Sequence, residues 1–185
     1  MNDLVDTLHR FARLFDDLEI PYAIMGGWAV RVYALPRPTY DIDFTIALDR
    51  ERLGELYAAA EHVGFTVPDP YRGGWVDSVA DMPLVKFRLY LADSGIDVDI
   101  FLAESSYQHE MMQRRVRHVI GGVPAWFVSV EDLILLKLIA GRTRDRADID
   151  DLLLARADLD EPYLRRWAGQ LGVEAKLDEV LASRE

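Results

Sequence analysis

Cysteine is absent from the 185-residue sequence, which excludes disulfides and thiolate metal sites. Long apolar runs are absent too: none approaches the roughly 20 residues that span a bilayer, so we expect no membrane helix. The N-terminal segment MNDLVDTLHR is acidic and amphipathic, and it lacks the basic start and apolar stretch of a signal peptide. The sequence therefore predicts a cytoplasmic protein.

Basic residues are few relative to acidic ones. The chain has 21 lysines and arginines against 32 aspartates and glutamates, which gives a net charge of −11 and a pI near 4.8. Non-specific binding to a nucleic-acid backbone relies on clustered lysine and arginine, so we do not expect it. Half of the residues are hydrophobic and 29% are charged, which is typical of a globular protein with one well-formed core.

Helical and strand patterns alternate over the first two thirds of the chain. Apolar residues at helical spacing predict a helix over 4–18, and the apolar run 22–25 predicts a buried strand before Gly26-Gly27. The elements expected next are a helix over 28–35, a strand over 39–48 (TYDIDFTIAL), a helix over 50–65 with Asp49 as N-cap, a long loop over 68–83, and two strands within 85–103 around the turn ADSG (92–95).

The last third is predicted to be mainly helical. We expect a helix over 106–119, a strand within 121–129, helices over 130–141, 146–157 and 161–172, and a weaker helix after Val173. Ser129 is the expected N-cap of the helix over 130–141. We interpret 1–128 as a catalytic core and 129–185 as a helical C-terminal segment packed on it as one compact unit.

A Gly-Gly pair follows the first predicted strand and precedes a helix. Glycine lets backbone N–H groups approach a ligand closely, and a helix N-terminus adds donors and partial positive charge. Gly26 and Gly27 therefore suit a phosphate, although a turn that only joins a strand to a helix has the same pattern.

Two strands carry alternating carboxylates. In TYDIDFTIAL, Asp41 and Asp43 share one face, while Tyr40, Ile42, Phe44 and Ile46 share the other. Paired hard oxygen ligands favour Mg²⁺ or Mn²⁺, whereas a solvated edge strand is the alternative. GIDVDIFLA repeats the pattern with Asp97 and Asp99, and this repetition favours a metal site.

Together these residues resemble a known family. Gly26-Gly27, DIDF starting at Asp41 and VDIF containing Asp99 resemble the nucleotidyltransferase superfamily with the polymerase-β-like fold. Its minimal bacterial members include AbiEii-type toxins and aminoglycoside nucleotidyltransferases, so a toxin–antitoxin or antibiotic-resistance role is compatible with the resemblance. The segment 128–152 resembles the helical part that follows the catalytic domain. The implied fold is α+β, a mixed sheet flanked by helices with a helical C-terminal segment.

The resemblance also implies a mechanism. Gly26 and Gly27 would hold the phosphates of a nucleoside triphosphate (NTP), ATP among them, and Asp41 and Asp43 would coordinate two Mg²⁺ ions, facing the glycines across a phosphate-sized gap. Asp99, with Asp97 in reserve, would be the third metal-binding carboxylate and help to activate an acceptor hydroxyl. In-line attack on the α-phosphate would transfer the nucleotide and release pyrophosphate.

Other polar residues have two interpretations each. Arg37 and Thr39 precede the acidic strand where a triphosphate would lie, but they also suit an exposed turn. Lys137 interrupts an apolar helix and either extends to solvent or reaches a phosphate. The cluster QRRVRH (113–118) is either a solvated helix face or a contact for an RNA acceptor. We expect Asp145 at a solvated helix start and Asp148, Asp150 and Asp151 to be exposed.

Three functions are compatible with the sequence. The first is a Mg²⁺-dependent nucleotidyltransferase whose hydroxyl acceptor is a small molecule, a tRNA or a protein. The second is a catalytically inactive module of the same fold that binds a partner, and the third is a carboxylate-rich site for divalent ions without a nucleotide. The third leaves Gly26-Gly27 unexplained, and the complete set of carboxylates argues against the second.

Overall fold

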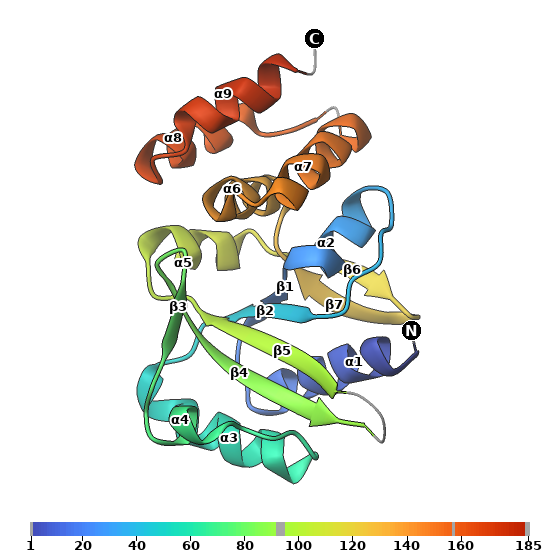
Figure 1. The fold of residues 1–185 in the computed structure, drawn as a ribbon, viewed down its shortest axis with the longest axis vertical. Helices are drawn as coiled ribbons and strands as arrows, with labels where there is room; N and C mark the ends of the chain where they lie inside the picture. Colours follow the sequence, from blue (N-terminus) through green and yellow to red (C-terminus); the bar gives the residue numbers. More distant parts are fainter. Residues whose placement is uncertain (1, 92–94, 157, 184–185) are drawn as a thin grey trace.

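A computed structural model describes residues 2–91, 95–156 and 158–183 of the chain. The strands within these residues are β1 (Tyr22–Ile24), β2 (Ile42–Ile46), β3 (Asp77–Val79), β4 (Met82–Tyr90), β5 (Gly95–Leu102), β6 (Val116–Ile120) and β7 (Val123–Phe127). These seven described strands form one sheet in the order β3-β4-β5-β2-β1-β7-β6 (Figure 1). The sheet is mixed, because β2 pairs parallel with β5 and antiparallel with β1.

Helices cover both faces of the sheet. They are α1 (Asn2–Asp17), α2 (Gly26–Tyr33), α3 (Leu53–His62), α4 (Asp69–Arg72), α5 (Ser106–Gln113), α6 (Val130–Ala140), α7 (Thr143–Ala155), α8 (Glu161–Gln170) and α9 (Glu174–Ala182). Figure 1 shows α1, α3 and α4 on one side of the sheet, and α2 with α6 and α7 on the other side. Helices α8 and α9 lie farther out, beyond α6 and α7. The predicted α+β fold class is confirmed.

Aromatic residues form the core between α1 and the sheet. Phe11 of α1 contacts Phe44 of β2 and Phe87 of β4, with ring centroids 5.8 and 5.4 Å apart. Because successive strand residues point to opposite faces, Asp43 next to Phe44 must point away from α1. The apolar half of the alternation therefore fixes the carboxylates on the face covered by α2 and α6.

The prediction of a long loop over 68–83 is wrong. This segment contains α4, β3 and the start of β4, and β3 and β4 form a hairpin. Its two turn residues, Ala80 and Asp81, have φ values of +50° and +61°. Such turns usually contain Asn-Gly or Asp-Gly, so Ala-Asp carries no hairpin signal in the sequence.

The expected helix over 106–119 is also too long. It ends at Gln113, and Val116–Ile120 form β6, which pairs antiparallel with β7. The cluster QRRVRH is therefore no helix face: Arg115 and Arg117 place their guanidinium groups over the ring of Trp126. Strand pairing with β7 and this stacking oppose continuation of the helix.

Three smaller expectations need correction or stay open. Tyr40 precedes β2 and is 78% exposed, so it does not share the buried face of Phe44. Asp49 makes no side-chain cap, and a 3-10 turn over Arg50–Arg52 precedes α3. The predicted turn ADSG falls mostly on 92–94, outside the described residues, and the division at residue 128 stays a prediction. None of the described helices has the length and apolar character needed to cross a membrane.

Candidate active site

One cavity of about 560 Å³ collects three of the aspartates that the sequence singled out. Asp41, Asp43 and Asp99 line it together with Gly26 and Lys137. Its apolar wall comes from the β3–β4 hairpin, β5 and α6, namely Val79, Met82, Phe101, Leu133 and Leu136. The cavity therefore joins strands and helices that are distant in sequence, and both polar and apolar side chains line it.

Strand pairing brings Asp99 rather than Asp97 to the other carboxylates. Asp43 of β2 and Asp99 of β5 are direct partners in the parallel register. Asp97 lies two residues earlier, its side chain is 59% exposed, and it pairs with Arg88 at 3.1 Å. It is not among the residues that line the cavity.

The two glycines allow close packing at the start of α2. Gly26 has φ +62°, and a Cβ built there would lie 1.9 Å from Asp43 Oδ2. A Cβ on Gly27 would lie 2.5 Å from Thr39 Oγ1, and this hydroxyl donates to Asp41 Oδ1 at 3.0 Å. The prediction of a phosphate-sized gap between Asp43 and Gly26 is therefore wrong, because these two residues are in contact. Thr39 orients Asp41 instead of lining the cavity.

Ionisation of Asp43 is opposed by its surroundings. Burial raises its pKa, and the neighbouring carboxylates Asp41 and Asp99 raise it further, to about 7, although Arg142 and Lys137 oppose the shift. The pKa is raised because the ionised form is only partly hydrated and faces two like charges. A bound cation would relieve both effects.

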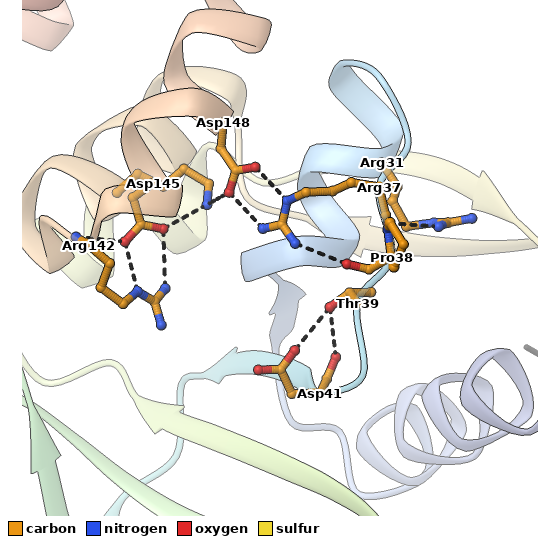
Figure 2. A network of polar contacts seen from close by, with 9 residues as sticks. Arg31, Arg37, Pro38, Thr39, Asp41, Arg142, Asp145 and Asp148 are labelled. Carbon is orange, nitrogen blue, oxygen red and sulfur yellow. Dashed lines mark hydrogen bonds and ion pairs between the residues drawn. The ribbon is translucent and has the colours of Figure 1, made fainter.

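A network of ion pairs connects the loop before β2 to the C-terminal helices (Figure 2). Arg37 donates to both carboxylate oxygens of Asp148 at 2.5 and 2.6 Å. Lys137 Nζ lies 2.5 Å from Asp148 and 3.1 Å from Asp145, and Arg142 donates to Asp145 at 2.8 Å. Two aspartates of α7 thus fix three cations from three different segments.

Several predictions on this network are wrong. Asp145 and Asp148 do not lie in solvent as the sequence predicts, because each side chain is 2% exposed. Lys137 does not extend to solvent, because its side chain is 4% exposed. Arg37 lies against Asp148 and is not among the lining residues, whereas Lys137 and Arg142 line the cavity. Sequence reasoning missed Arg142 as a residue of the site.

The residues present suit a hard divalent cation in ligand type and in charge. Carboxylate oxygens are the ligands preferred by Mg²⁺ and Mn²⁺, and the raised pKa of Asp43 marks uncompensated negative charge. Among the described residues, no three acidic or histidine side chains are grouped closely enough to hold a metal ion as they stand. Asp99 is engaged by Lys86, whose Nζ lies 2.8 Å from Oδ2.

The mixed sheet with its flanking helices has the fold of the nucleotidyltransferase class. Residues 3–174 match the model of a family described as nucleotidyltransferases of unknown function (DUF6036). The chain belongs to this family. No curated protein matches the chain significantly in sequence.

Solved structures with the same fold include three nucleotidyltransferase-like proteins. An antigenic nucleotidyltransferase-like protein from Paracoccidioides brasiliensis is 19% identical, with 98% of this chain and 93% of that chain covered and a TM-score of 0.59. The antibiotic-resistance factor ANT(2'')-Ia is 20% identical, with coverages of 98% and 95% and a TM-score of 0.57. The lincosamide adenylyltransferase LnuA is 16% identical, with coverages of 78% and 93% and a TM-score of 0.50.

Proposed function

We propose that this protein transfers a nucleoside monophosphate from a nucleoside triphosphate to an acceptor hydroxyl, with Mg²⁺ as cofactor and pyrophosphate as product. The observation that carries the proposal is the convergence of Asp41, Asp43 and Asp99 on one cavity beside the start of α2. Family membership supports the same class of reaction.

Each group has a proposed role. Asp41 and Asp43 would supply oxygen ligands for Mg²⁺, which would neutralise phosphate charge and polarise the α-phosphorus. Lys137 and Arg142, on the same cavity, would attract the phosphates of the nucleotide. The backbone N–H groups at Gly26 and Gly27 would add donors at the N-terminus of α2.

The reaction balances without a further reactant. The acceptor oxygen forms a bond to the α-phosphorus, and the bond from that phosphorus to the bridging oxygen of the β-phosphate breaks. Pyrophosphate leaves with the electron pair, and the hydroxyl proton passes to a carboxylate of the site. Asp99 is the proposed acceptor of that proton, because it borders the cavity from the strand next to Asp43.

The apolar wall guides the choice of acceptor. ANT(2'')-Ia is an antibiotic-resistance factor and LnuA acts on a lincosamide antibiotic, so small hydroxyl compounds are the first class to screen. The hydroxyls of tRNA and of proteins form the second and third classes. Val79 and Met82 belong to a cavity of about 560 Å³, which suits a small molecule with an apolar face.

The experiment is incubation with each α-labelled triphosphate, Mg²⁺ and fractions of a cell lysate. We expect label to enter one fraction with the wild-type protein and not with the variant Asp41→Asn/Asp43→Asn. Asp99→Asn should reduce transfer, whereas Asp97→Asn should retain it. Transfer that survives in the double variant contradicts the proposal. Stabilisation by a triphosphate without any transfer would favour the inactive module instead.

A further inference from the structure

A lysine lies beside the third carboxylate. Lys86 of β4 and Asp99 of β5 are opposite each other in the antiparallel register. The Lys86 Nζ atom lies 2.9 Å from Asp99 Oδ1 and 2.8 Å from Asp99 Oδ2, so it engages both oxygens. Because the backbone ladder fixes the two residues opposite each other, the ammonium group stays within reach of Asp99.

The same row of residues continues to the next strand. Asp99 is the register partner of Asp43 on its other side, so Lys86, Asp99 and Asp43 form one line across β4, β5 and β2. Register partners on neighbouring strands share a face of the sheet. The lysine is therefore on the face of the sheet that carries the candidate site.

The three carboxylates of the cavity differ in their charge partners. Asp99 has Lys86, whereas no ion pair within 4 Å joins a lysine or arginine to Asp41 or Asp43 in the described part of the chain; Arg142 and Lys137 act on Asp43 from farther away. Asp41 accepts a hydrogen bond from Thr39, at 3.0 Å. The described residues also contain no ready cluster of three metal-binding side chains. Asp41 and Asp43 are thus the carboxylates of the cavity that no described ion pair neutralises.

We propose that Lys86 provides the positive charge at Asp99, so that the site binds one divalent ion, through Asp41 and Asp43, instead of two. This inference rests on the proposed function and narrows its cofactor requirement. An ammonium group that engages both oxygens of Asp99 must be displaced before a second ion can use them. It also repels that ion, since like charges a few ångströms apart interact strongly at a partly buried site.

The β4–β5 ladder supplies a matched control. Arg88 and Asp97 form the next pair on the same face, with their charged groups 3.1 Å apart, and both side chains are about half exposed. This pair does not line the cavity. Arg88→Met therefore removes one positive charge from the same two strands without removing the partner of Asp99.

The test is a count of bound Mn²⁺ by electron paramagnetic resonance. The protein is saturated with a triphosphate whose α,β-bridging oxygen is replaced by methylene, and Mn²⁺ is titrated. We expect one tight Mn²⁺ per wild-type chain, and likewise for Arg88→Met and Lys86→Arg. Lys86→Met should bind a second Mn²⁺ at least about tenfold more tightly than the wild type, because loss of one close charge is worth a factor of this order.

The outcomes separate this inference from the proposed function. Two tight ions in the wild type, or the same titration curve for Lys86→Met and the wild type, would overturn the role of Lys86 and leave nucleotide transfer intact. Absence of Mn²⁺ and nucleotide binding in every variant would overturn both. A second ion gained in Lys86→Met and lost again in Lys86→Met/Asp99→Asn supports the proposal.

Discussion

Removal of the Asp148 charge should destabilise the fold, because it leaves positive charges at a buried site without their partner. The Asp148 side chain is 2% exposed, and it accepts from Lys137 at 2.5 Å and from Arg37 at 2.5 and 2.6 Å. Asp148→Asn keeps the shape but leaves Lys137, itself 4% exposed, with Asp145 as its remaining partner. Breaking a buried ion pair from one side typically costs about 3–5 kcal/mol.

The lower end of that range applies here. Asp145 remains beside Lys137, and Arg37 is 23% exposed, so water can solvate part of its charge. We therefore expect a loss of about 3 kcal/mol in the free energy of unfolding. For a chain of this size each 1 kcal/mol lowers Tm by about 2–4 °C, which gives a decrease of about 6–12 °C.

The assay is urea unfolding followed by far-UV circular dichroism, with Asp150→Asn as the matched control. Asp150 lies on the same helix and pairs with Arg146 at the surface, so its loss should cost less than about 1 kcal/mol. Lys137→Met/Asp148→Asn should lose less stability than the sum of the two single variants. If the free energy of unfolding of Asp148→Asn lies within about 1 kcal/mol of the wild-type value, the network does not stabilise the fold as argued.

Two further predictions follow from the same site. Burial opposes ionisation of Asp145 and Asp148, yet the hydrogen bonds that they accept from arginine and lysine hold each pKa below its usual value. The stability that the two carboxylates contribute is therefore present above about pH 4 and is lost as the pH falls further. Urea midpoints measured from pH 3 to 7 should decrease less steeply toward acid pH for Asp148→Asn than for the wild type. Gly26→Ala should abolish Mn²⁺ binding and nucleotide transfer, because the added Cβ would displace Asp43. Gly122 is the control, since it has a similar positive φ of +84° and open space around its Cα. Gly122→Ala should lower the free energy of unfolding by about 1–2 kcal/mol, the cost of the left-handed backbone, and leave Mn²⁺ binding unchanged.

Local patterns in the sequence predict the strands that carry the carboxylates. The alternation in Ile42–Ile46 places Phe44 in the core and Asp43 on the opposite face, as the structure has it. The same pattern in β5 places Val98 and Ile100 inside and leaves Asp97 and Asp99 equivalent. Periodicity cannot choose between those two aspartates, because the choice depends on which residue pairs with Asp43 across the sheet.

Segments whose conformation depends on distant partners were harder to predict. The β3–β4 hairpin turns at Ala80 and Asp81, which carry no glycine signal, and it contributes Val79 and Met82 to the cavity. Lys86 gave no signal either, because one lysine on an alternating strand usually faces solvent. Its role depends on the register of β4 with β5, which brings it opposite Asp99.

The buried ion network shows why charged residues mislead a sequence-based prediction. Aspartates in a segment such as RTRDRADIDD are usually exposed, and propensity gives no reason to bury two of them. Asp145 and Asp148 are three residues apart, so they share one face of α7. Lys137 interrupts the apolar run of α6 and needs a partner if it is buried. A lysine within an apolar helix, followed closely by aspartates at i and i+3 spacing, therefore indicates an interior ion pair between adjacent helices, and the structure has this arrangement.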